Sequence, residues 1–295
     1  MGSEIAQVVG RTASLVVIGL TAATMSCAVW PFNQFTNNGG PDPDVRHLDD
    51  GTSTKPGAAR MGASSRLQFD PSDVCFAVPL TEARIDRSQP RDFQKAKQAF
   101  DRGLRLQQDG QHPDALVEFQ RALRADQTFG LAHLEAAISH MYTDHDAPVM
   151  RKHLAAAVIL LPQNPRAQLN FGRLLQENGE MPLAERHFGC ALTLAPDLAV
   201  AHEALARLLL GQTRMQEAER RARSAVALAP TQTTYRVLLA DILTRNERWK
   251  EAGVEVEQAA RQVGRSAALY RRAADLYAKA GADDEATRLR KEADM

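Results

Sequence analysis

The sequence predicts an all-α protein, a solenoid of about six helix–turn–helix repeats that follows a signal segment and a flexible linker. Alanine recurs at a spacing of 34 residues in the second half of the chain, at Ala184, Ala218, Ala252 and Ala286. Aromatic residues make up only 5% of the chain and hydrophobic residues 44%, which favours helices packed closely through small side chains. The N-terminal part contains an uncharged apolar run and then a stretch rich in Pro, Gly, Asp, Ser and Asn.

The charge balance disfavours a nucleic-acid-binding function. Lys+Arg and Asp+Glu both number 36, so the formal net charge is zero. A protein that binds nucleic acid needs a cationic surplus to displace counterions from the phosphates. We therefore expect no nucleic-acid partner.

The three cysteines, Cys27, Cys75 and Cys190, form no CxxC motif and no other metal-ligand spacing. A disulfide framework needs more cysteines than this. In an oxidising compartment one possibility is a single disulfide bond between Cys75 and Cys190. The alternative is that both cysteines behave as small buried hydrophobic residues.

Residues 1–26 read as a signal peptide. No charged residue lies between Thr12 and Pro41, and Arg11 precedes an apolar run that ends in small residues. A short apolar segment behind a basic residue is typical of a secretory signal, which is excluded from reasoning about the fold.

The end of this segment, Thr24-Met25-Ser26-Cys27, resembles a bacterial lipoprotein signal. Thr24 stands where that signal usually has leucine. The resemblance implies that the chain is cleaved before Cys27, that Cys27 is lipidated, and that Ala28 directs the protein to the outer membrane. Two alternatives stay open: an ordinary signal peptide, and an uncleaved helix over about residues 12–32, near the ~20 residues needed to span hydrocarbon.

Residues 27–89 are predicted to be a flexible tether. Residues 31–72 are rich in Pro, Gly, Asp, Ser and Asn, a composition that cannot offset the entropy of ordering. Random-coil scaling gives the tether a reach of roughly 40–45 Å. One apolar island, residues 74–80, interrupts it. Either the island docks in extended form on the solenoid, or it is a mildly hydrophobic patch within the tether.

Residues 90–295 are predicted to form the solenoid. The third copy of the repeat carries Ala184, Phe188, Ala191 and Pro196, and the turn between the two helices of a hairpin carries Gly110, Gly179 and Gly281. This 34-residue pattern resembles the tetratricopeptide repeat (TPR), a helix–turn–helix hairpin that stacks into a right-handed superhelix. The predicted repeats are 96–129, 131–164, 165–198, 199–232, 233–266 and 267–295, with one slip in register at Gly130.

The resemblance implies a binding groove on the concave face, lined by the first helix of each repeat. In TPR proteins positions 2, 5, 6, 9, 12 and 13 of a repeat face this groove. The residues so assigned are Phe100, Leu104, Tyr142, Arg166, Leu169, Asn170, Arg173, Glu203, Arg207, Val237, Asp241 and Arg245, together with Glu135, Ser139, Arg271, Arg272 and Asp275.

Two features of these residues suggest a ligand. Apolar side chains such as Leu104 and Val237 suit an amphipathic helix or an extended apolar peptide. The arginines Arg166, Arg173 and Arg207 recur at similar heights and suit carboxylates. The alternative is that these arginines pair with Glu203 and neighbouring acids as solvated surface.

No catalytic motif is present in the sequence. His202-Glu203 begins like a zincin motif, but Ala206 stands in place of the second histidine. Residues 140–146 contain two histidines and two aspartates, which we interpret as turn and N-cap material. There is no GxSxG, Walker or GxGxxG motif. We therefore expect no enzymatic activity, no cofactor, no metal and no small-molecule substrate.

The sequence thus predicts an outer-membrane lipoprotein that faces the periplasm and binds a protein or peptide partner. If Cys27 carries no lipid, the protein is secreted or anchored in the inner membrane. The architecture resembles the pilotin lipoproteins of type IV pilus biogenesis. The alternatives are an accessory subunit of another envelope machine, for polysaccharide export or cell-wall synthesis, and an adaptor that regulates a partner enzyme.

Overall fold

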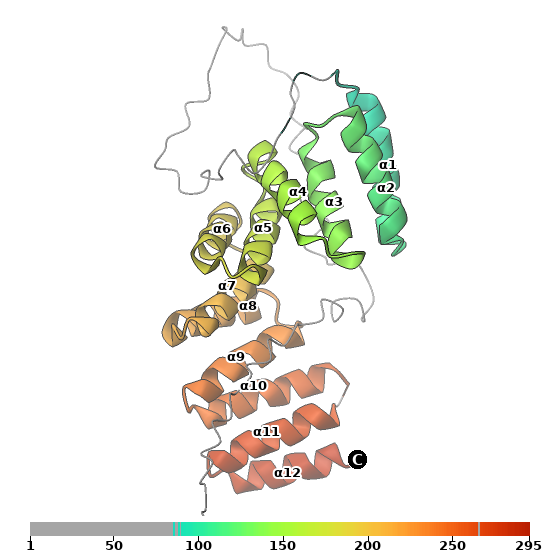
Figure 1. The fold of residues 1–295 in the computed structure, drawn as a ribbon. Helices are drawn as coiled ribbons and strands as arrows, with labels where there is room; N and C mark the ends of the chain where they lie inside the picture. Colours follow the sequence, from blue (N-terminus) through green and yellow to red (C-terminus); the bar gives the residue numbers. More distant parts are fainter. Residues whose placement is uncertain (1–84, 86–87, 89, 265) are drawn as a thin grey trace, which may run out of the picture. The chain divides into compact units, whose positions relative to one another are not determined.

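The computed structural model describes residues 85, 88, 90–264 and 266–295, and this part of the chain consists of twelve α-helices joined by short turns (Figure 1). The signal segment and the apolar island at 74–80 lie outside the described residues. The helices are α1 Phe93–Gln108, α2 His112–Ala125, α3 Gly130–Tyr142, α4 Ala147–Leu160, α5 Pro165–Glu177, α6 Met181–Leu194, α7 Ala199–Gly211, α8 Met215–Leu228, α9 Thr233–Arg245, α10 Trp249–Gln262, α11 Ala267–Lys279 and α12 Asp283–Ala293. None of them is both long and apolar enough to cross a bilayer.

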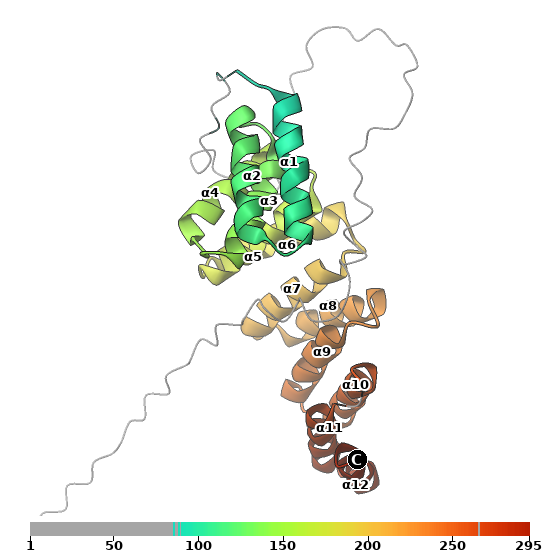
Figure 2. The same cartoon turned by 90° about the vertical axis from the view of Figure 1, so that its right-hand side faces the viewer.

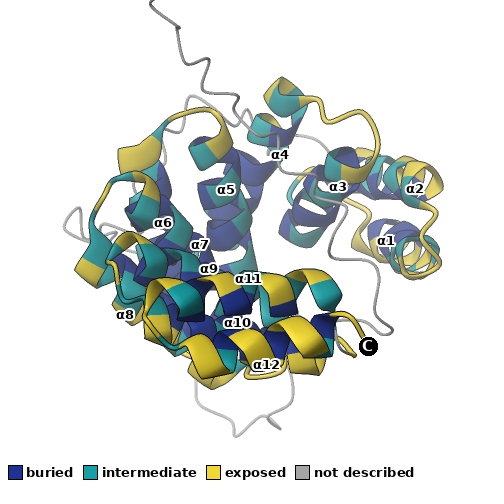
Figure 3. Cartoon of the chain, turned by 90° about the horizontal axis from the view of Figure 1, so that it is seen from below, coloured by how far each residue is buried: buried dark blue, intermediate teal, exposed yellow. Residues whose placement is uncertain are grey.

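Each helix packs against the helix before it and the helix after it, so the helices form six consecutive hairpins (Figures 1 and 2). A hairpin cannot bury its apolar face alone, and stacking joins the separate faces into a continuous core. On α12 the exposed residues follow the outer face (Figure 3), while Ala286, Leu289 and Ala293 are buried. The prediction of an all-α repeat array is confirmed.

Within a hairpin a large aromatic ring on the second helix packs against a glycine on the first. A Cβ atom built on Gly172 would lie 2.7 Å from the ring of Phe188, and one built on Gly103 would lie 2.6 Å from the ring of Phe119. Both phenylalanines are 0% exposed. The glycines are therefore required for the close approach of the two helices.

The turn inside each hairpin contains one residue in the left-handed conformation, two positions before the second helix begins. It is glycine in three hairpins, Gly110, Gly179 and Gly281, with φ between 72° and 80°. In the other three hairpins the residues with positive φ are His145, Thr213 and Glu247. Because the left-handed conformation disfavours residues with a Cβ atom, these three turns carry local strain.

The replacement Thr213→Gly is expected to raise the free energy of unfolding by about 0.5–1 kcal/mol. The left-handed conformation costs an L-residue about 1–2 kcal/mol, of which the greater chain entropy of glycine offsets about 0.5–1 kcal/mol. The measurement is urea unfolding followed by circular dichroism. The matched control is Thr193→Gly inside α6, which should lower stability by about 1 kcal/mol. A loss of stability in both variants would contradict the prediction.

The second repeat differs from its prediction in register. Helix α3 begins at Gly130, and four residues, 143–146, separate it from α4, where three residues, 178–180, separate α5 from α6. The second repeat therefore starts at 130 and not at 131, and the extra residue lies in the turn. Gly130 is needed inside the helix because a Cβ atom there would lie 2.6 Å from Leu161 Cγ.

A recurring hydrogen bond confirms the corrected register. The fourth residue of each of three first helices bonds to a backbone carbonyl six residues earlier. His133 Nε2 lies 3.1 Å from the oxygen of Gln127, and Gln168 Nε2 donates over 3.2 Å to Pro162. His202 Nε2 lies 3.0 Å from the oxygen of Pro196. These side chains satisfy the carbonyl groups between repeats, where no backbone donor is available.

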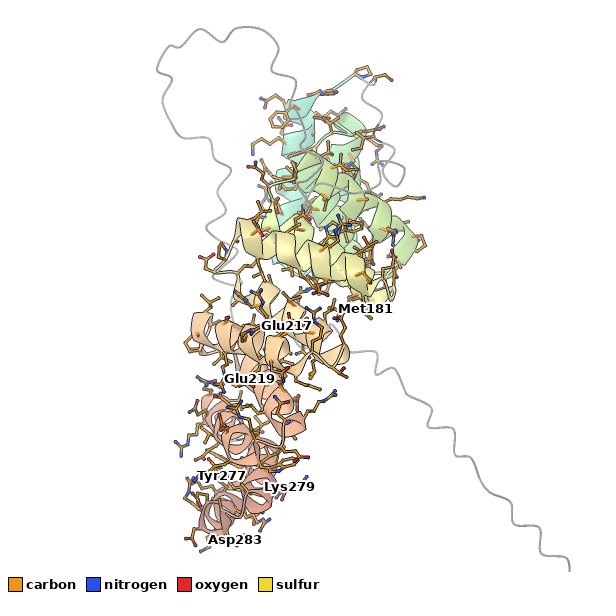
Figure 4. All side chains as sticks on the ribbon, turned by 90° about the vertical axis from the view of Figure 1, so that its left-hand side faces the viewer. Met181, Glu217, Glu219, Tyr277, Lys279 and Asp283 are labelled. Atoms are coloured by element: carbon orange, nitrogen blue, oxygen red, sulfur yellow. The ribbon has the colours of Figure 1, made fainter. Side chains whose placement is uncertain are left out.

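Ion pairs join the second helix of one repeat to the turn of the next, always between residues 29 positions apart. Arg151 pairs with Glu180, Glu185 with Arg214 at 2.6 Å, and Glu219 with Arg248 at 2.6 Å. Glu219 lies on α8, on which Glu217 is also labelled (Figure 4). Since these side chains are partly exposed, solvent screens each pair and its contribution to stability is small.

Candidate functional site

The first helices of successive repeats, α1, α3, α5, α7, α9 and α11, border a common surface, here called the A-helix face. Glu135 on α3 accepts hydrogen bonds from Gln107 on α1 at 3.2 Å and pairs with Arg166 on α5 at 3.1 Å. Helix α5 contacts α7, and α7 contacts α9. Asp241 on α9 pairs with Arg272 on α11. The residues predicted to line the groove come from these helices.

Five of the predicted groove residues are buried: Phe100, Glu135, Ser139, Leu169 and Glu203. Phe100 is 7% exposed, and its ring lies 5.6 Å from that of Phe119 and 4.9 Å from that of Phe129. Leu169 is 4% exposed and belongs to the main core. Glu203 is 5% exposed. Phe100 and Leu169 therefore hold helices together and offer little surface to a partner.

Tyr142, at the end of α3, is the most exposed of the apolar and aromatic residues predicted to line the groove. Tyr142 is 40% exposed, and its ring stacks on that of His112 with the centroids 4.2 Å apart. With the corrected register, positions 9 and 12 of the second repeat fall on Ile138 and Met141, which are partly buried. The predicted residue Ser139 is 0% exposed. Counting 34 residues on from the start of the first repeat, at 96, places the second repeat at 130 and would have found Ile138 and Met141.

Further along the face Leu104 and Val237 are half-buried, and Asn170 donates to the carbonyl oxygen of Arg166 at 2.8 Å.

The arginines of the face fall into two classes. Arg166 pairs with the buried carboxylate of Glu135, and Arg207 pairs with the buried carboxylate of Glu203. The charges of these two arginines are already neutralised. Arg173 and Arg245 form no salt bridge within the described part of the chain. Arg173 is half-buried on α5, where it interacts electrostatically with Glu177, and Arg245 is exposed on α9.

The polar residues of the turn at 140–146 have separate structural roles. His140 Nδ1 lies 2.7 Å from Asp144, and Asp146 caps α4 by accepting a hydrogen bond from the backbone of Val149 at 3.1 Å. His145 lies 3.5 Å from Glu177. Among the described residues, no group of three or more His, Cys, Asp or Glu side chains is placed to hold a metal ion.

Three histidines cluster between α3 and α4. His133 Nδ1 lies 2.9 Å from His153 Nδ1, and the His140 ring stacks on that of His153 with the centroids 6.0 Å apart. Burial lowers the pKa of His153 to about 4, helped by the charges of its two neighbours, and burial also lowers the pKa of His133. His133 and His153 border a cavity of about 320 Å³ that α2 completes. His133 and His153 are therefore packed as neutral groups at pH 7.

Cys190 on α6 is 3% exposed and is disulfide-bonded. The other half of the bond lies outside the described residues. Of the two roles considered from the sequence, Cys190 therefore does not have the one in which it is a free thiol that only packs in the core.

No protein-family model and no curated protein matches the sequence. The fold is similar to that of PilF of Pseudomonas aeruginosa, with a TM-score of 0.58, 21% identity, and 66% of this chain and 89% of that chain covered. PilW, a widely conserved type IV pilus biogenesis factor, gives a TM-score of 0.58 at 16% identity, covering 66% and 90%. YrrB, a TPR protein with an unusual peptide-binding site, gives 0.50 at 16% identity, covering 59% and 90%.

The chain folds as a tetratricopeptide-repeat solenoid. The twelve described helices supply the six TPR hairpins, and the TPR signature predicted from the spacing of alanine, phenylalanine and proline is confirmed. At these identities the similarity establishes the fold, and the function has to be argued from the site.

Proposed function

We propose that this TPR solenoid is a non-enzymatic scaffold that binds a protein partner on its A-helix face in the bacterial cell envelope. The observation that carries the proposal is that first helices of consecutive repeats carry an exposed aromatic side chain, Tyr142 on α3, and a half-buried arginine, Arg173 on α5. An aromatic side chain and an arginine without a salt bridge are the residue types that dominate binding energy at interfaces.

The partner is an amphipathic helix or an extended apolar peptide that carries a carboxylate. Tyr142, Ile138 and Met141 supply apolar surface, and Arg173 supplies a bidentate donor for the carboxylate. Arg245 offers a second cation on α9. The salt-bridged Arg166 and Arg207 contribute less, because a partner would have to compete with buried carboxylates that are already bound.

A photo-crosslinker at position 142 is expected to trap a defined partner in cells of the source organism. The matched control is the same crosslinker at Val117 on α2, which is 44% exposed but lies on a second helix. Introducing Arg173→Ala into the crosslinking chain should reduce the yield at least ~10-fold, the effect of losing about 1.4 kcal/mol of a charge-assisted hydrogen bond. Equal crosslinking from positions 117 and 142 would contradict the proposal.

The scaffold is anchored by a lipid on Cys27 and faces the periplasm from the outer membrane. The sequence before Cys27 supports this anchoring, and the disulfide at Cys190 supports an oxidising compartment. The similarity to PilF and PilW favours assistance in the assembly of a pilus or secretion complex over polysaccharide export, cell-wall synthesis or regulation of a partner enzyme.

The variant Cys27→Ala is expected to lose membrane association completely. The wild-type chain should lack its first 26 residues, carry acyl mass and sediment with the outer membrane, since two or more acyl chains give stable anchoring. The measurements are intact mass and membrane fractionation of both proteins. If both keep Met1, or if both are cleaved elsewhere without lipid, the anchoring proposal fails and the binding proposal stands on the crosslinking alone.

A further inference from the structure

One position of the second helices is open to solvent in some repeats and closed in others. The tenth residue of the second helix is exposed in α2 and α10, where it is Arg121 and Gln258, and half-buried in α8, where it is Ser224. In α4 and α6 it is Ala156 and Cys190, each only 3% exposed. In α2, α8 and α10 the packing of the repeats leaves this tenth position accessible. The burial of Ala156 and Cys190 therefore indicates that a further segment covers α4 and α6.

The surface of α6 around Cys190 has the composition of a covered surface. Side chains at spacings of three and four residues share one side of a helix. On α6 the stripe consists of Leu183, His187, Cys190 and Leu194, all of them buried or half-buried. The corresponding residues of α8 are Glu217, Arg221, Ser224 and Leu228, of which Arg221 and Leu228 are exposed. Thus α6 presents an apolar stripe where the next repeat presents a largely polar one.

We propose that residues 74–80 dock across α4 and α6 and are fixed there by a disulfide bond between Cys75 and Cys190. Cys190 is disulfide-bonded, and the sequence offers only Cys27 and Cys75 as its partner within the chain. Cys75 lies inside the only apolar island of the tether, so its flanking residues match the apolar stripe on α6.

The choice of Cys75 over Cys27 rests on the proposed function, because a lipidated Cys27 carries its sulfur in a thioether and has no thiol to oxidise. Chain length permits the pairing. The 15 residues from Cys75 to Pro90 span up to about 50 Å when extended. Pro79 disfavours a helix in this segment and suits an extended, docked conformation.

Formation of the bond removes two protons and two electrons from the thiols of Cys75 and Cys190. The electrons pass to the disulfide of a thiol–disulfide oxidoreductase by exchange. One thiolate attacks the oxidant's disulfide, and the second thiolate then displaces the reduced oxidant from the mixed disulfide. The S–S bond of the protein is formed and that of the oxidant is broken, so the reaction is balanced in an oxidising compartment.

Peptide mapping of the full chain, purified from membranes with free thiols blocked, tests the pairing. Trypsin is expected to yield residues 67–84 joined to residues 187–207, and reduction should separate them. Alkylated Cys190, or a link from 187–207 to the peptide that carries Cys27, would overturn the proposal. A 67–84 link together with an unacylated Cys27 supports the disulfide and overturns the lipid anchor, so the two proposals fail separately.

Thiol labelling of the oxidised protein tests the docking. In the full chain, a cysteine introduced as Ala156→Cys should react with a maleimide at least ~10-fold more slowly than its counterpart Ser224→Cys, because a covered site reacts only through local opening. Adding Cys75→Ser, with the unpaired Cys190 blocked by prior alkylation or changed to serine, should bring the rate at position 156 up toward that at position 224. Equal rates at the two positions in the oxidised protein would overturn the docking.

Discussion

Replacing Phe188 with alanine is expected to lower the free energy of unfolding by about 3–5 kcal/mol, the usual cost of removing a buried phenylalanine side chain. The ring is 0% exposed and fills the space above Gly172. Glycine has no side chain that could move into the vacated volume, so the cavity persists and the cost falls at the upper end of this range.

Urea unfolding followed by circular dichroism measures the effect, with Phe93→Ala as the control. Phe93 is 52% exposed, and its replacement should cost less than about 1 kcal/mol. A second test uses the contact itself: Gly172→Ala and Phe188→Leu should each destabilise, while together they should cost less than the sum, because the smaller ring makes room for the new methyl group. Additive costs would show that the two residues do not share a packing constraint.

Acidification from pH 7 to pH 4 is expected to destabilise the second repeat by about 2–3 kcal/mol through His153 alone. The pKa of His153 is lowered to about 4 in the folded protein, from an ordinary value of 6.5. Between pH 4 and pH 6.5, His153 is therefore protonated in the unfolded chain and neutral in the folded chain. The contribution of neutral His153 to the free energy of unfolding is fully present above pH 6.5 and is lost as the pH falls toward 4. His133 shifts in the same direction.

The variant that isolates this effect is His153→Gln, since glutamine and histidine already pair in the third repeat, where His187 Nδ1 lies 2.7 Å from Gln168 Oε1. Its unfolding free energy should change less between pH 7 and pH 4 than that of the wild type. Because carboxylates such as Glu177, whose pKa is raised by burial, also titrate in this range, the difference between variants is the relevant quantity. Equal slopes for His153→Gln and the wild type would contradict the assignment.

The repeat could be predicted from the sequence because its spacing records direct contacts: Gly172 touches Phe188, and Gly103 touches Phe119 in the first repeat. The register of the second repeat could not be predicted from the sequence, because helix propensity does not determine whether an extra residue belongs to a turn or to a helix. The backbone of the folded chain places Gly130 in α3 and the extra residue in the turn at 143–146.

The residues that line the groove were harder to predict, since the position of a residue within the repeat does not determine whether its side chain is exposed. Phe100 and Leu169 occupy groove positions and are nonetheless buried by residues of other helices. The partner of Arg166 is Glu135, 31 residues earlier, and no periodic pattern in the sequence links the two. Arg166 and Arg207 form salt bridges and Arg173 forms none within the described residues, and this difference can be seen only in the folded structure.

The ion pairs between residues 29 positions apart also determine which repeats are interchangeable. At the junction of the second and third repeats the second helix supplies the cation, Arg151, whereas at the next two junctions it supplies the anion. Excising residues 199–232 would set Glu185 against Arg248 and preserve an attractive contact. Excising residues 165–198 would set Arg151 against Arg214, two like charges. The fourth repeat can thus be removed or duplicated with opposite charges still facing each other at the new junction. Removal of the third repeat would bring two like charges together.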